Sequence, residues 1–98
     1  MAHSTHHDDY QLLIAVLRTA RRELRVTQVE LGERLGNTQT FISKVERGER
    51  RLDVVEFVEF CEALGASPEE TFRRYLGQRA RGSPPGKKKA SAGRSASG

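Results

Sequence analysis

Apolar residues recur three and four positions apart along most of the first 77 residues, a spacing typical of helices with one buried side. The first such stretch runs from Asp9 to Leu24, where the apolar residues form one stripe on a helical wheel. A second helix is expected from Thr27 to about Leu35, because "TQVE" at 27–30 has the spacing of a capping box. Gly36 suits the left-handed turn that commonly ends a helix.

Three further helices are each preceded by a side chain that can cap them. They are expected over 38–47, 53–64 and 67–76, with Thr38, Asp53 and Ser67 as the respective caps. Pro68 in the first turn strengthens the last of these. No stretch alternates between apolar and polar residues for long enough to predict a strand. The pattern therefore predicts an all-α fold, a compact five-helix bundle.

Composition divides the chain into three parts. Residues 1–8 are polar and are expected to be flexible, and residues 9–77 are expected to form one small domain. From residue 78 onward the chain consists mainly of Gly, Ser, Ala, Pro, Lys and Arg, without a large apolar residue. Such a segment buries too little apolar surface to offset the entropy of ordering, so 78–98 is expected to be a disordered basic tail.

The net charge of +4 hides a strong division along the chain. Residues 79–98 hold six Lys and Arg and no acid, and residues 18–51 hold nine Lys and Arg against five acids. Residues 52–72, by contrast, hold six acids and no base. The folded part is therefore expected to have a basic half and an acidic half, and the basic half suits a polyanionic partner.

Several classes of protein are disfavoured. No apolar run approaches the roughly 20 residues that span a bilayer, and the N-terminus lacks the pattern of a signal peptide. The single cysteine, Cys61, lies centrally in an apolar helical arc and is expected to be a core residue. His3, His6 and His7 could bind a metal, but a loose polar tail is favoured because no further His or Cys has a supporting spacing. We expect no catalytic site, no metal and no cofactor.

The helix over 38–47 has two chemically different sides. Phe41, Ile42 and Val45 lie within one arc of roughly 100°, which we expect to face the core. The opposite arc holds only hydrogen-bonding and basic residues: Gln39, Thr40, Ser43, Lys44 and Arg47. Because that arc has no Asp or Glu, it favours contact with a polyanion over simple solvation.

Residues 28–47 resemble the helix-turn-helix of the XRE/Cro-type family, which includes phage repressors. The resemblance rests on Gly32, where two helices cross, on Gly36 at the turn, and on apolar residues at Leu31, Leu35, Ile42 and Val45. The pairs "TQ" at 27–28 and "IS" at 42–43 and the triplet "ERG" at 46–48 also match. In weaker form the similarity covers residues 10–76.

This resemblance implies roles for individual residues. Base-reading residues would be Gln39, Thr40, Ser43 and Lys44, and phosphate-contacting residues would be Gln28, Thr38, Arg47, Arg50 and Arg51. Glu46 would form a buried or half-buried ion pair with Arg21, the alternative being a free surface glutamate. Phe41 departs from the small residue of many relatives; packing at the edge of the core is favoured over contact with a thymine methyl group or sugar.

The helix over 53–64 has more apolar surface than one core contact requires. Its apolar residues spread over roughly 220° of the wheel, against a little over 100° for a single buried side. Val55 and Phe60, at the margins, are therefore expected to form a dimer surface. The alternative is a helix embedded deeply in a small bundle.

The expected function is sequence-specific binding of double-stranded DNA by a repressor-like transcriptional regulator. A homodimer would read a palindromic operator through the major groove. The alternative is an antitoxin-type protein that binds a partner toxin and its own promoter. We expect a soluble cytoplasmic protein, associated with the bacterial nucleoid when bound to DNA. Lysines 87–89 could add DNA affinity or serve only solubility.

Overall fold

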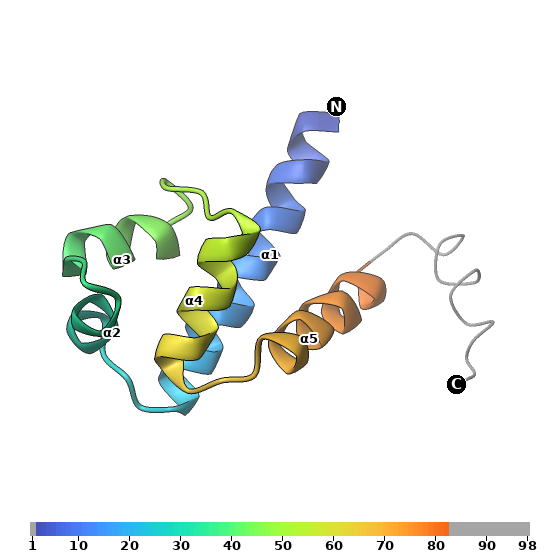
Figure 1. The fold of residues 1–98 in the computed structure, drawn as a ribbon. Helices are drawn as coiled ribbons and strands as arrows, with labels where there is room; N and C mark the ends of the chain where they lie inside the picture. Colours follow the sequence, from blue (N-terminus) through green and yellow to red (C-terminus); the bar gives the residue numbers. More distant parts are fainter. Residues whose placement is uncertain (1, 83–98) are drawn as a thin grey trace.

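The computed structural model describes residues 2–82 of the 98 residues (Figure 1). The helices in this range are α1 (Ala2–Glu23), α2 (Gln28–Leu35), α3 (Gln39–Glu46), α4 (Val54–Leu64) and α5 (Pro68–Arg81). Between residues 2 and 82 there is no strand, so the predicted all-α, five-helix architecture is confirmed. The predictions for the rest of the tail, including lysines 87–89, lie outside the described residues.

Two helix ends differ from the sequence-based expectation. Helix α1 begins at Ala2, whereas residues 1–8 were expected to be flexible. Its first turns project beyond the bundle (Figure 1), which is why the sequence has no stripe of apolar residues there. They can still be helical, because extending an existing helix adds one hydrogen bond for each residue ordered. Helix α5 continues past Gly77 to Arg81, into the stretch that was expected to belong to the tail. This extension contacts α1, because Arg79 Nε lies 3.2 Å from Asp9 Oδ2.

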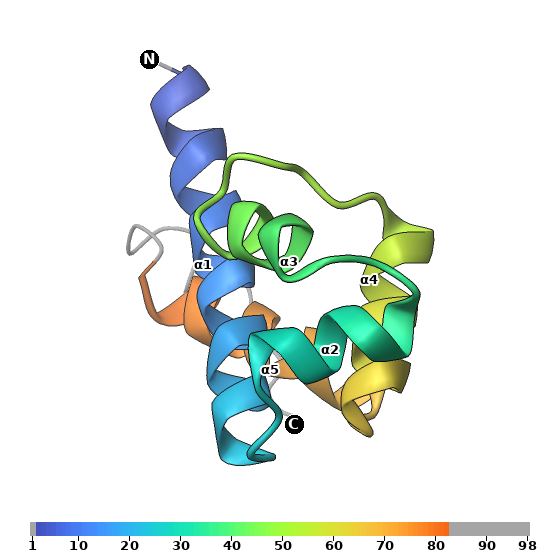
Figure 2. The same ribbon diagram turned by 90° about the vertical axis from the view of Figure 1, so that its left-hand side faces the viewer.

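The helices divide into two groups around α1. Helices α2 and α3 lie together on one side, and α5 lies on the opposite side (Figure 1). Figure 2 shows α3 crossing above α2 in front of α1. One continuous core joins them: Ile14, Leu17, Ala20, Val26, Leu31, Ile42, Val45, Phe57, Phe60, Cys61 and Leu64 are all buried in it. Removal of this apolar surface from water is the main force that holds the helices together.

Every helix start that was expected from a cap is confirmed. Thr27, Thr38, Asp53 and Ser67 each accept a hydrogen bond from the backbone N–H three residues further on. At α2 and α4 the bond is reciprocated by Glu30 and Glu56, which completes two capping boxes. These bonds satisfy amide groups that have no partner within the helix.

Helices α1, α2, α3 and α4 end in the same hydrogen-bonding pattern. After each helix a left-handed residue bonds through its N–H to the carbonyl three residues back, and the next N–H bonds to the carbonyl five residues back. The left-handed residues are Arg25, Gly36, Gly48 and Gly65, with φ of 61°, 68°, 78° and 82°. Arg25 is the one non-glycine residue with positive φ in the described part of the chain.

The predicted dimer surface is wrong at Phe60. Its side chain is only 3% exposed, and its ring centroid lies 6.3 Å from that of Phe41. Helix α4 is thus covered from the α3 side as well as from α1 and α2, which accounts for part of its wide apolar arc. The same contact supports the predicted packing of Phe41 at the edge of the core. Val55 is 65% exposed and remains on the surface.

Cys61 lies in the core, as predicted, with 0% exposure. Burial raises the pKa of its thiol, so the protonated form is favoured at neutral pH. A buried, protonated thiol packs as a small apolar side chain.

A buried ion pair joins α1 to α3. Arg21 Nε donates to Glu46 Oε2 at 2.6 Å and Arg21 Nη2 donates to Glu46 Oε1 at 3.1 Å. The two side chains are 11% and 7% exposed, and Arg21 Nη1 also donates to the carbonyl of Val26 at 2.9 Å. The expected ion pair is therefore present, and it ties the end of α3 to α1 and to the loop before α2.

We expect Gly32→Val to destabilise the fold. A Cβ at Gly32 would lie 3.0 Å from the carbonyl carbon of Thr38, and backbone atoms cannot move aside as a side chain does. The overpacked variant should lose about 1–3 kcal/mol of unfolding free energy in urea denaturation. Gly32→Ala should lose less, because about 1 kcal/mol of helix propensity opposes the crowding. Equal stability of Gly32→Val and the wild type would contradict the close crossing.

We expect Glu46→Ala to lower the unfolding free energy by about 3–5 kcal/mol, because it leaves the Arg21 charge buried without its partner. Replacing both members, as in Arg21→Met with Glu46→Leu, should recover most of that loss. Glu59→Ala, an exposed substitution on α4, is the control and should change stability by less than about 0.5 kcal/mol. A Glu46→Ala protein as stable as this control would show that the pair does not support the fold.

Candidate nucleic-acid interface

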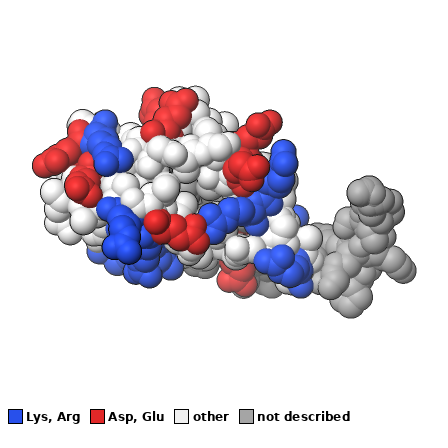
Figure 3. Space-filling model, turned by 90° about the horizontal axis from the view of Figure 1, so that it is seen from below, with Lys and Arg blue, Asp and Glu red and all other residues white. Residues whose placement is uncertain are grey.

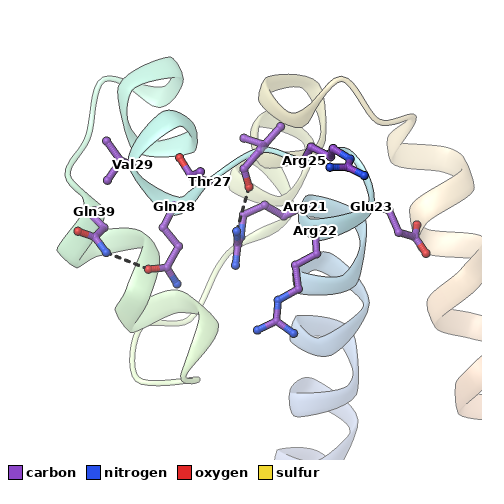
Figure 4. Close-up of a pocket in the computed structure, with 9 residues that line it drawn as sticks. Arg21, Arg22, Glu23, Arg25, Thr27, Gln28, Val29 and Gln39 are labelled. Atoms are coloured by element: carbon purple, nitrogen blue, oxygen red, sulfur yellow. Dashed lines mark hydrogen bonds between the residues drawn. The ribbon is translucent and has the colours of Figure 1, made fainter.

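A chain of hydrogen bonds leads from the buried ion pair to the surface. Gln28 Nε2 donates to Glu46 Oε1 at 3.0 Å, and Gln39 Nε2 donates to Gln28 Oε1 at 3.2 Å (Figure 4). Gln28 is the first residue of α2 and Gln39 is the first residue of α3. The order Arg21, Glu46, Gln28, Gln39 therefore fixes two polar side chains at adjacent helix N-termini relative to α1.

The exposed side of α3 carries the predicted base-reading residues. Gln39, Thr40 and Lys44 are exposed and Ser43 is half-buried, while Ile42 and Val45 are buried on the opposite side. The wheel therefore assigned the two sides of this helix correctly. The one acid of α3, Glu46, is 7% exposed and is turned into the ion pair, so the outer face of α3 carries no negative charge.

The predicted phosphate-contacting residue Thr38 has a structural role. Its hydroxyl caps α3 by accepting a hydrogen bond from the N–H of Phe41 at 3.1 Å. The hydroxyl hydrogen is not used in that bond, so Thr38 can still donate to an anion.

The three arginines after α3 all have partners within the protein. Arg47 donates to Glu49 at 2.9 Å and to the hydroxyl of Ser43, and Arg50 donates to Glu56 at 2.8 Å. Hydrogen bonds from these guanidinium groups lower the pKa of both glutamates. Arg51 lies over the ring of Tyr10, 4.2 Å from its centroid. Each arginine is at the surface beside α3, but each would exchange an internal contact for a phosphate.

An open concavity of about 670 Å³ lies between the end of α1 and the starts of α2 and α3 (Figure 4). Its lining residues are Arg21, Arg22, Glu23, Arg25, Val26, Thr27, Gln28, Val29 and Gln39. Gln28 and Gln39 lie on one side in Figure 4, and Arg21, Arg22 and Arg25 lie on the other. The concavity thus brings two predicted DNA-contacting residues next to a group of arginines.

Arg22 and Arg25 line this concavity, and the sequence pattern assigned them no role. Both are exposed, and both belong to the +4 stretch over 18–51 that indicated a basic half. That charge count was the available signal, but it could not separate arginines with partners from those without.

Charged side chains of both signs cover the surface. In the view from below the molecule, basic side chains gather in one patch at the lower left, and acidic and basic side chains are interspersed over the rest of the face (Figure 3). The six acids of residues 52–72 belong to α4, α5 and the turns before them. Two of them, Glu56 and Glu59, line a small pocket together with Asn37 and Phe41, so the acidic stretch borders the start of α3.

The described residues hold no group of three or more His, Cys, Asp and Glu that could bind a metal ion. None of the helices between residues 2 and 82 is both long and apolar enough to cross a membrane.

Comparison with known proteins identifies a family model and a relative that match this chain. A helix-turn-helix domain family model matches residues 13–73. An uncharacterized HTH-type transcriptional regulator, y4dJ, from Sinorhizobium fredii is 43% identical over 47 residues, which cover 48% of this chain and 61% of that protein. The chain thus matches less than two thirds of the length of that relative.

A solved structure supports the same assignment over nearly its whole length. The XRE-family like protein from Pseudomonas syringae pv. tomato is 40% identical, with a TM-score of 0.73, and the match covers 79% of this chain and 94% of that one. The resemblance noted in residues 28–47 is therefore confirmed at the level of the complete fold. This chain belongs to the XRE family of helix-turn-helix proteins.

Proposed function

We propose that the protein is a transcriptional regulator that binds double-stranded DNA sequence-specifically, and that it acts as a repressor at a palindromic operator. One observation carries the proposal: the acid-free outer face of α3 is fixed to α1 through Arg21, Glu46, Gln28 and Gln39. An α-helix fits the major groove of B-form DNA, where each base pair presents a distinct pattern of donors and acceptors.

Gln39 retains the groups that adenine recognition needs. Its amide has two N–H donors and one acceptor oxygen, and the bond to Gln28 uses one donor. One N–H and the oxygen remain, which is the pair that bonds N7 and N6 of adenine. The side-chain amide of Gln28 likewise has one N–H left for a backbone phosphate after its bond to Glu46. The hydrogen bonds within the protein thus orient both glutamines without using up their contacts.

The remaining residues of α3 complement these two. The methyl group of Thr40 can contact a thymine methyl, and Ser43 can donate to a base or phosphate. Lys44 is exposed and has no hydrogen bond or ion pair within the described residues, so it is available for guanine or phosphate. Arg47, Arg50 and Arg51 contact phosphates in this proposal after releasing Glu49, Glu56 and Tyr10.

Two copies of the chain would read the two halves of the operator. Four exposed apolar side chains lie on α4 and α5: Val54, Val55, Phe72 and Leu76, exposed by 78%, 65%, 45% and 46%. Val54 and Phe72 also line a largely apolar groove of about 380 Å³ between these helices. A dimer through this face would cover apolar surface and leave α3 of each copy free for a half-site.

The same face also suits the second candidate function, an antitoxin-type protein that binds a partner toxin and its own promoter. The apolar groove favours a protein partner in either case, so the oligomeric state in solution distinguishes the two.

Selection of bound fragments from random double-stranded DNA should enrich a motif of two inverted half-sites about 10 base pairs, or a multiple of this, apart. Gln39→Ala should lose about 1–3 kcal/mol, roughly 5- to 150-fold in affinity, and should relax the preference at one position of each half-site. Lys44→Ala should alter a different position or weaken binding to every sequence.

Gln78→Ala on α5 is the matched control, because it removes the same amide from the other side of the bundle. It should leave the selected motif and the affinity unchanged. A wild-type protein that enriches no motif would contradict sequence-specific binding.

A Val54→Asp, Val55→Asp double variant should dissociate the dimer while the monomer stays folded. The two side chains are exposed, and acidic residues are favourable in the first turn of a helix. Sedimentation equilibrium should show a dimer for the wild type and a monomer for the variant, with unchanged circular dichroism. A wild type that stays monomeric at every concentration tested would contradict homodimerisation and favour the partner-binding candidate.

A further inference from the structure

We propose that Arg22 and Arg25 bind a stretch of the DNA phosphate backbone beyond the contacts of α2 and α3. This contact explains why position 25 holds an arginine in spite of the strain in its backbone. This inference rests on the proposed function, because it assigns further DNA-contacting residues to the same interface. It concerns affinity for the sugar-phosphate backbone and not the reading of bases.

The first observation is that most basic residues of the basic half are already in use. Of the nine Lys and Arg over 18–51, six have partners within the protein: Arg18, Arg21, Arg34, Arg47, Arg50 and Arg51. Within the described residues, Arg22, Arg25 and Lys44 have no hydrogen bond, ion pair or ring contact. Lys44 lies on α3, so Arg22 and Arg25 are the cations of this stretch with no partner to release and no role assigned from the sequence.

The second observation is where these two arginines lie. Both line the concavity that Gln28 and Gln39 line from the other side (Figure 4). In Figure 4, the side chain of Arg22 extends from α1 into the space in front of that helix, and Arg25 lies on the loop above it. If Gln39 contacts a base and Gln28 contacts a phosphate, the DNA strand bound by Gln28 continues along the side of the concavity that Arg22 and Arg25 line.

The positive charge of Arg22 and Arg25 is not neutralised by the acidic residue of the concavity. Glu23 is the acidic residue that lines the concavity, and Figure 4 shows its carboxylate turned toward α5 and away from Arg22. On α5, Arg74 Nη1 donates to Glu23 Oε1 at 3.2 Å. The concavity therefore presents the unpaired guanidinium group of Arg22 to an anion, with the unpaired guanidinium group of Arg25 at its rim. A guanidinium can bind phosphate through two parallel hydrogen bonds.

The third observation is the backbone of Arg25. Its position corresponds to Gly36, Gly48 and Gly65, which occupy the same left-handed place in the same hydrogen-bonding pattern after α2, α3 and α4. Glycine adopts this conformation without steric strain, whereas a residue with a Cβ is strained there. Strained residues of this kind cluster at functional sites, where the side chain serves a purpose other than stability. At Arg25 that purpose is a cation at the rim of the concavity.

One substitution, Arg25→Gly, should have opposite effects on stability and on DNA binding. Arg25→Gly removes both the strain and the cation, so its thermal unfolding midpoint should rise by a few degrees while its affinity for DNA falls. Arg25→Ala removes the cation and keeps the Cβ, so it should lose the same affinity without the gain in stability. Arg25→Lys should keep most of the affinity.

Binding should be measured by fluorescence anisotropy across a series of salt concentrations, on the selected operator and on a duplex of unrelated sequence. Each lost phosphate contact reduces the slope of log K against log salt by about 0.9, which corresponds to about fivefold weaker binding at 0.15 M salt. Arg25→Gly and Arg22→Ala should each show this loss on both duplexes, because phosphate contacts carry no sequence information.

Two substitutions separate this effect from general ones. Arg73→Ala removes an exposed arginine of α5 and should leave the slope unchanged. Gly65→Ala adds a Cβ at the equivalent left-handed turn after α4, where no other atom lies within 4 Å, so it should lower the unfolding midpoint and leave DNA binding unchanged.

Failure of the inference is distinguishable from failure of the proposed function. If the wild type binds its selected motif and the Arg22 and Arg25 variants keep the full salt slope, the phosphate contact is wrong and the regulator is not. Weaker binding of these variants to the operator alone would indicate base reading and would also overturn the inference. If the wild type binds no DNA, both proposals fall.

Discussion

The ion pair between Arg21 and Glu46 is the interaction on which the arrangement of the DNA-binding half depends. Two hydrogen bonds of 2.6 and 3.1 Å, almost excluded from solvent, hold the last residue of α3 against the last turns of α1. A buried charge pair of this kind contributes less net stability than its short distances suggest, because both ions lose hydration. Its main effect here is to fix geometry. It holds the Glu46 carboxylate in one position, and that carboxylate in turn orients the side-chain amide of Gln28.

The surface chemistry follows from that buried contact. Glu46 is the one acid of α3, and its place in the core side of the helix leaves the outer face uncharged except for Lys44. Gln39 is oriented by Gln28 and still has a donor and an acceptor to offer. Preorganisation of this kind reduces the side-chain entropy that is lost when a complex forms. The arginines after α3 are arranged differently, since each is held by an internal partner that phosphate must replace.

Local features of the fold were predictable from the sequence, and long-range ones were less so. The caps at Thr27, Thr38, Asp53 and Ser67 depend on residues three positions apart, so their spacing alone located four helix starts. The Arg21–Glu46 pair spans 25 residues and was expected only through the family resemblance. Phe60 was misassigned because a helical wheel gives the direction of a side chain but does not show that Phe41 of another helix covers it.

In the candidate site, too, local features were predictable from the sequence and long-range ones were not. The two faces of α3 were predictable because periodicity determines them. The proposed role of Arg22 and Arg25 was not, because it depends on which arginines find a partner in three dimensions, as Arg50 does with Glu56. The left-handed backbone of Arg25 was also not predictable, since the sequence has no glycine to mark the end of α1 as it does for α2, α3 and α4.

The most direct test of the central claim is to map the DNA contact by NMR, following backbone and side-chain amide shifts of the full chain during titration with its selected operator. We predict the largest shifts at residues 39–44 of α3, at the side-chain amides of Gln28 and Gln39, and at the loop after α1. Glu59 and Glu62 on α4 should shift little, because they belong to the acidic stretch. Shifts centred on α4 and α5, with those of Gln28 and Gln39 unchanged, would contradict the account.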